Sequence, residues 1–159
     1  MTRLRGRVRG GQRLHDHALG GHWHTVTMLG SIRFDGVTSC LVIAGATDSD
    51  VFREYVRQVL GPTLRCGDIV VCDNLAAHRN AEAQKLIEAH GAHLLFLPAY
   101  SPDLNPIEMV WSKVKAHLRQ AKARTDPDLL AAIGQALQTV SATDAQGFFR
   151  HAGHVCTIY

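Results

Sequence analysis

The chain has 159 residues, of which 46% are hydrophobic and 19% charged, and its formal net charge is +3 at pH 7. This length suits one domain with a substantial core, and the apolar content excludes an intrinsically disordered chain. The longest apolar runs, at 41–46 and 94–97, are far shorter than the roughly 20 residues that a membrane-spanning helix needs. No apolar stretch follows the basic residues at the start, so a signal peptide is not expected.

The four cysteines show no pattern of a disulfide framework or a metal site. They form no Cys-x-x-Cys pair and no metal-ligand spacing, and they are Cys40, Cys66, Cys72 and Cys156. In a chain of this length we interpret them as reduced thiols, and we expect a cytosolic protein.

Positive charge is concentrated in two parts of the chain. Five arginines precede the first acid, Asp16, and they are Arg3, Arg5, Arg7, Arg9 and Arg13. A second basic set lies between Glu108 and Asp126, and it comprises Lys113, Lys115, Arg119, Lys122 and Arg124. Clusters of this kind suit a polyanion such as nucleic acid, whereas solvated surface charge is the alternative interpretation.

The first half of the chain predicts a hairpin followed by a helix. Residues 24–34 are rich in Thr, Val, Met and Ile and indicate a strand, and Asp35-Gly36 is a strong hairpin signal before a returning strand at 37–44. Asp48 can cap a helix with apolar residues at a helical period, which Gly61-Pro62 would end.

The middle of the chain predicts a strand, a helix and a second strand. The run at 68–73 is short and nearly all apolar, as expected of a parallel-type strand that is covered on both faces. A helix is expected at about 80–90, with Gly91 as its C-terminal stop, and a strand at 93–97. An irregular, proline-bearing turn follows at 98–106.

Helices dominate the last third. A long helix is expected from Pro106, a further helix from Asp126-Pro127 by cap and first-turn proline, and a short one at 143–150. No repeat, low-complexity stretch or internal linker interrupts the chain. The order of elements therefore predicts one mixed α/β domain.

Two acidic residues stand where the predicted elements favour a functional site. Asp73 ends the strand at 68–73, and open α/β sheets bind ligands at the carboxyl ends of their strands. Since an acid there is also a common turn former, Asp73 alone is a weak indication. Glu108 is the third residue of the helix that Pro106 opens, where a capping box with Asn105 would explain it structurally.

Considered together, the two acids indicate a metal site. A helix, a strand and a turn separate them, and such a unit can bring the start of the next helix beside the end of the first strand. Two neighbouring carboxylates repel each other unless a cation lies between them. Mg²⁺ commonly binds one or two carboxylates plus substrate phosphates, and paired ions of this kind support phosphodiester cleavage.

Two motifs make this indication specific. The first is Val-Val-Cys-Asp-Asn-Leu-Ala-Ala-His at 70–78, and the second is Leu-Pro-Ala-Tyr-Ser-Pro-Asp-Leu-Asn-Pro-Ile-Glu-Met-Val-Trp at 97–111. With 34 residues between Asp73 and Glu108, the combination resembles DDE-type transposases (DDE superfamily endonucleases) of bacterial insertion sequences related to the mariner elements. The resemblance runs through essentially the whole chain.

This resemblance implies a ribonuclease H-like fold, with a mixed sheet flanked by helices. It also implies that Asp73 and Glu108 are the second and third members of an acidic triad that binds Mg²⁺ or Mn²⁺ in a two-metal site. The first catalytic aspartate of the family lies on the first, central strand. Neither Asp16 nor Asp35 occupies a matching position, so no first acid is assigned.

We therefore expect residues 1–159 to form a partial, N-terminally truncated catalytic domain without that central strand. Within it, residues 1–22 are expected to be an irregular basic segment, and residues 125–159 to contain the C-terminal helices. The helix-turn-helix region that reads the element's ends in full-length relatives is not found in this sequence.

Several further residues are candidates for the site. His78 matches a histidine common in the first motif, and it would orient a metal-bound carboxylate or the DNA, or else make a helix-start hydrogen bond. Asn74 and Asn105 are expected to be turn and cap residues that also line the site. The candidate DNA-binding residues are Arg3, Arg5, Arg7, Lys113, Lys115 and Arg119.

Other residues are interpreted structurally. The segment Tyr100-Ser101-Pro102 is expected to fix the loop that presents Glu108, and Trp111 to belong to the core. A histidine group resembles a metal cluster, but the resemblance places it in a variable loop and strand entrance. Its members are His15, His17, His22 and His24.

The implied function is DNA transposition by metal-dependent hydrolysis at transposon ends, followed by attack of the freed 3′-hydroxyl on target DNA. The resemblance implies a TA-rich target and at least a dimer, in a bacterial protein associated with the nucleoid when it acts. We expect little activity of the isolated chain. One alternative is a non-catalytic fragment or regulator that binds DNA or full-length transposase, or the downstream half of a frameshifted transposase. A more remote one is a cellular nuclease of the same fold, with its first acid from Asp16 or Asp35.

Overall fold

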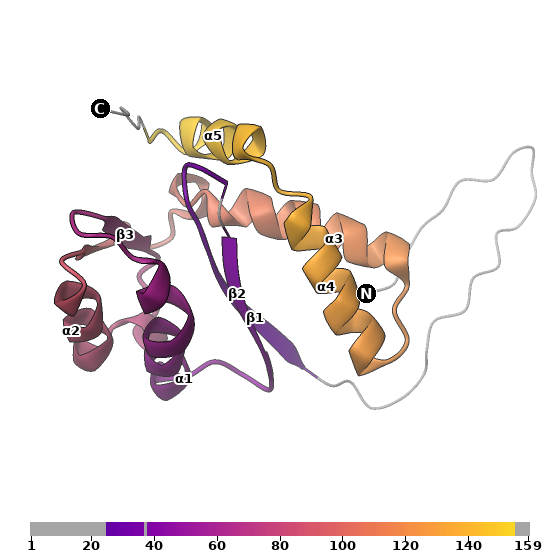
Figure 1. Ribbon diagram of the computed structural model, residues 1–159, viewed down its shortest axis with the longest axis horizontal. Coiled ribbons are helices and arrows are strands. Elements are labelled where there is room, and N and C mark those ends of the chain that lie inside the picture. The colour runs from indigo at the N-terminus through magenta and orange to yellow at the C-terminus, as the bar shows by residue number, and fades with distance from the viewer. Residues whose placement is uncertain (1–24, 37, 155–159) are drawn as a thin grey trace, which may run out of the picture.

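A computed structural model of the protein describes residues 25–36 and 38–154 (Figure 1). The mixed α/β class is confirmed, with five α-helices and four short strands in this part of the chain. No helix within the described residues is both long enough and apolar enough to cross a membrane.

The predicted hairpin is present at the start of the described chain. Strand β1 (Val26–Ile32) pairs antiparallel with β2 (Thr38–Ala44) along their full lengths. Gly36 closes the turn, since its amide donates to the Arg33 carbonyl at 3.1 Å and its φ of +89° is one that glycine adopts without strain. The Asp-Gly signal therefore located the turn correctly.

Helix α1 (Ser49–Tyr55) begins where the sequence predicts it. The Asp48 side chain accepts hydrogen bonds from the amides of Asp50 and Val51 at 3.0 and 2.8 Å, as an N-cap does. The helix does not simply end at Gly61-Pro62, because it continues as a π-helical turn (Val56–Leu60) and a 3₁₀ turn (Gly61–Thr63).

A parallel pair of strands follows, as predicted. Strand β3 (Ile69–Cys72) pairs with β4 (His93–Phe96), and helix α2 (Ala81–Ala89) connects them. Asn80 caps α2, and Gly91 follows it in the left-handed region with a φ of +73°. The Leu97 amide extends the ladder by donating to the Cys72 carbonyl at 2.8 Å.

The sheet itself differs from the expectation. The described strands form two separate two-stranded sheets, so each of β1 and β3 has one strand partner, and no continuous ribonuclease H-like sheet is present within residues 25–36 and 38–154. The prediction that 68–73 is covered on both faces is also wrong for these residues. Ile69 is 64% exposed and Leu95 of β4 is 54% exposed, because only the opposite face of this pair packs against the helices.

Three helices complete the chain, namely α3 (Ile107–Ala121), α4 (Asp126–Gln138) and α5 (Ala142–His151). The cap of α4 is Thr125 and not Asp126, since the Thr125 hydroxyl accepts from the Asp128 amide at 3.2 Å. Helix α5 opens with a capping box between Ser141 and Asp144.

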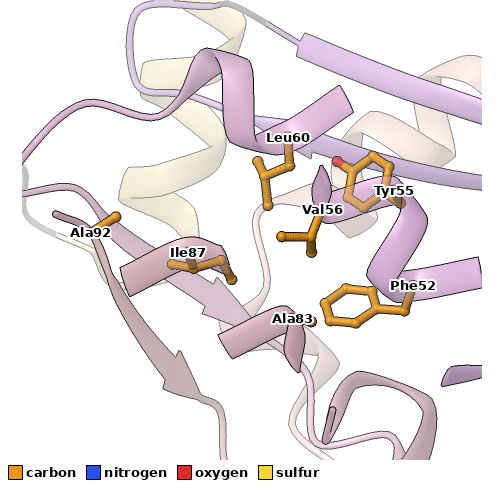
Figure 2. Close-up of a cluster of buried hydrophobic side chains, with 7 residues drawn as sticks. All are labelled: Phe52, Tyr55, Val56, Leu60, Ala83, Ile87 and Ala92. Atoms are coloured by element: carbon orange, nitrogen blue, oxygen red, sulfur yellow. The ribbon is translucent and has the colours of Figure 1, made fainter. Parts of the chain in front are cut away.

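Two hydrophobic cores cover the two faces of the β1–β2 hairpin, with α1 and α2 on one side and α3 and α4 on the other (Figure 1). The first core buries Phe52, Tyr55, Val56, Leu60, Ala83, Ile87 and Ala92 (Figure 2). The second buries Val110, Val114, Leu118, Ala132, Ile133, Ala136 and Val140. Leu29 packs against the first core and Met28 against the second, as alternation along a strand requires.

Trp111 joins the hairpin to α3, which supports its interpretation as a packing residue. It packs against the second core, and a Cβ atom built on Gly30 of β1 would lie 2.6 Å from the Trp111 Cη2 atom. Glycine at position 30 therefore allows the indole to lie against the strand backbone. Since Trp111 is one turn beyond Glu108, this contact fixes the first turns of α3 relative to the hairpin.

A bidentate ion pair connects the two sheets. Arg33, just after β1, donates from Nη1 and Nη2 to the two carboxylate oxygens of Asp68 at 2.8 and 3.0 Å, and Asp68 immediately precedes β3. The Arg33 hydrogen bond is the main cause that holds the pKa of Asp68 below its ordinary value. Because the pKa of Asp68 is lower in the folded state than in the unfolded state, the ion pair stabilises the fold. Its full contribution is present above the unfolded pKa of about 3.9 and is lost as the pH falls below that value.

We expect Arg33→Met to lower the free energy of unfolding by about 1–2 kcal/mol at pH 7, because it removes a charged hydrogen bond that is only partly exposed. The difference from wild type should narrow as pH falls below the ordinary aspartate pKa of about 3.9, because protonation of Asp68 removes the ion pair. Urea unfolding at pH 7 and below pH 4 measures the difference in the free energy of unfolding. The control is Arg57→Met, because Arg57 is exposed. A difference that stays constant over this pH range would contradict the expectation.

Candidate functional site

Asp73 lies directly after β3, at the carboxyl end of the parallel pair. Its side chain is 40% exposed, and its Oδ1 atom lies 2.5 Å from Nδ1 of His78 and accepts from the Leu75 amide at 3.4 Å. The other oxygen, Oδ2, has no hydrogen-bond partner among the described residues. Asp73 thus has a fixed carboxylate with one oxygen atom available to a ligand.

Glu108 lies in the first turn of α3 and is exposed. The capping box considered for it is absent, because α3 has Pro106 at its N-cap and no side-chain capping hydrogen bond. Asn105 does accept weakly from the Ile107 amide, at 3.4 Å, but the Glu108 carboxylate makes no hydrogen bond or ion pair within residues 25–36 and 38–154. Folding therefore gives this carboxylate no structural partner, and it remains available to a ligand.

The topology relates the two acids through one short loop. Because β3 and β4 are parallel neighbours, Asp73 and the loop that leads to Glu108 leave the sheet at the same edge. The loop starts at Leu97, whose amide donates a hydrogen bond to the carbonyl of Cys72, the residue before Asp73. No hydrogen bond between described residues joins the two carboxylates.

The donor set fits Mg²⁺ or Mn²⁺. The described residues contain no cluster of three or more His, Cys, Asp and Glu side chains arranged to hold a metal ion. Mg²⁺ does not need one, since it usually retains waters and binds one or two carboxylates plus substrate phosphates. Partly exposed carboxylate oxygens without protein partners, on Asp73 and Glu108, suit that mode of binding.

Cys72 does not offer alternative nucleophilic chemistry at this position. Burial, reinforced by the neighbouring Asp73 charge, raises the pKa of the Cys72 thiol to about 12. Burial likewise raises the pKa of Cys40 to about 11. Both remain protonated thiols at neutral pH, and the thiolate is the reactive form. The prediction of free thiols is confirmed for the described cysteines, Cys40, Cys66 and Cys72.

Contrary to the expectation, the loop before Glu108 is not held by Tyr100. The Tyr100 side chain is fully exposed, so it does not fix the loop by packing, and its backbone lies in the left-handed region at φ +59°. A 3₁₀ turn (Pro102–Leu104) provides local order, and Nε2 of His154 lies 2.8 Å from the Leu104 carbonyl oxygen. His154, which follows α5, was missed because it is 50 residues from its partner and has no local sequence signal.

The other two auxiliary candidates, Asn74 and His78, also have defined contacts. Asn74 accepts from Nε of Arg79 at 2.7 Å, as a turn residue does. His78 lies in a 3₁₀ turn (Ala76–His78), only 15% exposed, with its ring against Phe52 and its Nδ1 against Asp73. The structure therefore associates His78, more than Asn74, with the carboxylate.

The basic residues of α3 separate into two kinds. Lys113 donates from Nζ to the Thr139 carbonyl at 2.6 Å and to Asp144 Oδ2 at 2.9 Å, which joins α3 to α5 and lowers the pKa of Asp144. Lys115 and Arg119 have no ion pair within the described chain. The other candidates lie outside the described residues, namely Arg3, Arg5, Arg7 and the histidines His15, His17, His22 and His24.

Comparison with known proteins defines the class. The model of a family described as DDE superfamily endonuclease matches residues 1–130, and this chain belongs to that family. It is also 25% identical over 108 residues to the transposable element Tcb1 transposase of Caenorhabditis briggsae. That match covers 65% of this chain and 40% of the relative, so the chain spans less than half the length of that transposase.

Proposed function

We propose that this domain takes part in DNA transposition, as the part of a DDE transposase that supplies two carboxylates for metal-dependent strand cleavage and strand transfer. The observation that carries the proposal is the Glu108 carboxylate, which has no structural partner in the described chain although it opens a well-packed helix. Asp73, at the end of β3, supplies the second acid. Family membership and the similarity to a transposase support DNA as the substrate.

Asp73 and Glu108 would hold Mg²⁺ or Mn²⁺ between the end of β3 and the start of α3. A divalent ion held there would supply charge stabilisation for the attacking and leaving oxygens in phosphodiester chemistry. The protein's own contribution is orientation, because the Asp73 carboxylate is fixed by His78 and the α3 start is fixed by Trp111. Asn74 and Asn105 would shape the loops on either side.

A ribonuclease H-like sheet is part of the proposal. One further strand between β1 and β3 would join the order β2-β1 and the order β3-β4 into a single mixed sheet. In support, β1 and β3 each have one strand partner among the described residues, and unpaired ladder groups must find water or another strand. The family's first catalytic aspartate lies on such a strand.

The first acid is not assigned to this sequence. Asp35 lies in the β1–β2 turn, where its carboxylate is 3.6 Å from Arg65 Nη2, and Asp16 lies outside the described residues. We infer that the isolated chain has little strand-cleaving activity. DNA phosphates would contact Lys115 and Arg119 on α3, together with Arg3, Arg5 and Arg7, while Lys113 serves the α3–α5 contact.

Strand cleavage and DNA binding by the isolated chain test the inferred inactivity and the proposed DNA-binding residues. Purified chain is incubated with Mn²⁺ and labelled DNA that carries element ends, and Asp73→Ala is the control. We expect nicking close to the level of Asp73→Ala, and DNA binding that Lys115→Ala and Arg119→Ala weaken together. Robust cutting that Asp73→Ala abolishes would contradict the inferred inactivity, and DNA affinity independent of both basic residues would contradict the binding surface.

A second candidate function is regulatory. Since no first catalytic acid is assigned to this sequence, the chain would bind DNA or a longer transposase without cutting, or would act as the downstream half of a frameshifted transposase. The coding DNA upstream discriminates these cases. A shifted frame that encodes a helix-turn-helix and an Asp-Glu strand indicates the split element, whereas unrelated sequence indicates a regulator or a remnant.

A further inference from the structure

The side chain that fixes Asp73 is itself fixed from the hydrophobic core. The imidazole of His78 lies with its centroid 4.5 Å from the centroid of the Phe52 ring, at an interplanar angle of 41°. Phe52 belongs to α1 and is 3% exposed, in the first core (Figure 2). An aromatic contact of this kind restricts the orientation of the imidazole, in addition to the area that it buries.

The other end of the imidazole contacts the candidate ligand. Nδ1 of His78 lies 2.5 Å from Oδ1 of Asp73, and because a carboxylate can only accept, Nδ1 is the donor. The Leu75 amide donates to the same oxygen at 3.4 Å. These two donors both occupy Oδ1, which leaves Oδ2 available on the opposite side of the carboxylate.

We propose that His78, supported by Phe52, is the positioning residue that presents the Oδ2 atom of Asp73 to a divalent cation. This inference rests on the proposed function. A free aspartate side chain populates several rotamers, and selecting one of them before the cation arrives removes an entropic cost of binding. Phe52 in the core restricts the His78 ring, and His78 in turn restricts the Asp73 carboxylate, which is otherwise partly exposed.

Other roles for His78 are less consistent with its surroundings. It does not cap a helix with its side chain, since the 3₁₀ turn that it ends has no side-chain capping hydrogen bond and α2 is capped by Asn80. Its side chain is 15% exposed, so it offers little surface for DNA. Stabilisation of the turn by the Asp73 hydrogen bond alone is the structural alternative that an experiment must separate from positioning.

Two substitutions of His78 test its aromatic ring and its hydrogen-bond donor separately. His78→Phe keeps an aromatic ring against Phe52 and removes the hydrogen bond, whereas His78→Asn keeps an N–H donor near the Nδ1 position and removes the ring. Mn²⁺ affinity is measured by calorimetry on the full chain, and thermal unfolding of the metal-free variants is measured in parallel. Asp73→Asn and wild type are the reference proteins.

We expect His78→Phe to weaken Mn²⁺ binding about 10- to 100-fold, the range typical for an outer-shell partner, with little change in Tm. His78→Asn should recover part of that loss, because it restores the donor. Phe52→Leu should weaken binding in the same direction but less, since it loosens only the support of the ring.

Three results would overturn the inference. If His78→Phe binds Mn²⁺ as wild type does while Asp73→Asn loses binding, the proposed metal site stands and the positioning role of His78 is wrong. If His78→Asn and His78→Phe lose affinity equally and in proportion to a lower Tm, the histidine is structural only. If wild type and Asp73→Asn bind Mn²⁺ equally, the proposed site and this inference both fail.

Discussion

Replacing Asp73 by asparagine is expected to weaken Mn²⁺ binding about 100-fold or more, since even outer-shell partners of metal ligands typically contribute 10- to 100-fold. The substitution keeps the size of the side chain and an acceptor oxygen for the Leu75 amide, but it removes the negative charge. The fold should be little affected, because the Asp73 side chain is 40% exposed and its protein partners are local.

A matched control is available in the loop before α3. Asp103 is an exposed carboxylate in the 3₁₀ turn that precedes Glu108, and it is not one of the proposed ligands. Isothermal titration of Asp103→Asn should therefore give wild-type Mn²⁺ affinity. If Asp103→Asn and Asp73→Asn weaken binding equally, the ion responds to the general negative charge of this region and the assignment of Asp73 is wrong.

The largest effect on stability is expected from Ile87→Ala. Ile87 of α2 is fully buried in the first core, where Figure 2 shows it beside Val56 and Ala92. Removing its branched side chain leaves a cavity in a closely packed layer, which should cost about 3 kcal/mol in the free energy of unfolding. For a chain of this size, that loss corresponds to a Tm lower by roughly 10 °C.

The same substitution should also affect metal binding at the candidate site, because the first core contains Phe52, which contacts His78. We expect Ile87→Ala to bind Mn²⁺ somewhat more weakly at temperatures well below its Tm. Leu130→Ala on α4 is the control, because Leu130 is 52% exposed and its truncation should cost less than about 1 kcal/mol. Equal losses in urea unfolding for the two variants would show that the first core is not closely packed.

The elements that the sequence predicts correctly are those with local causes. The turn at Gly36 and the helix starts at Asp48 and Asn80 depend on residues within four positions of one another. Each acts through a backbone angle or a short side-chain hydrogen bond, which a sequence pattern records directly. Parallel pairing of β3 and β4 was also predictable, because a connecting helix permits it.

Contacts between distant residues could not be predicted in this way. Lys113 is a candidate for phosphate contact by composition, yet its partner Asp144 is 31 residues away and leaves no local pattern. Arg33 and Asp68 are 35 residues apart, and their pair connects two sheets that the sequence presents as one. The exposed face at Ile69 and Leu95 likewise depends on which elements cover the sheet, not on its apolar composition.

Glu108 shows the same limit at the candidate site. A capping box and a metal ligand both need an acid in the first turn of a helix, so the sequence alone leaves both interpretations open. The structure removes the first, because the Glu108 side chain makes no capping hydrogen bond at the start of α3. The motifs therefore predict the candidate site, whereas the availability of the Glu108 carboxylate depends on how the start of α3 is capped, which no local pattern records.

The most direct test of the account asks whether Asp73 and Glu108 bind the same ion. Mn²⁺ affinity is measured for wild type, Asp73→Asn, Glu108→Gln and the double variant. We predict that each single substitution weakens Mn²⁺ binding about 100-fold or more, and that the double variant loses less than the sum of the two single losses, because the carboxylates share one partner. Wild-type affinity in Glu108→Gln, or losses that simply add in the double variant, would contradict a shared metal site.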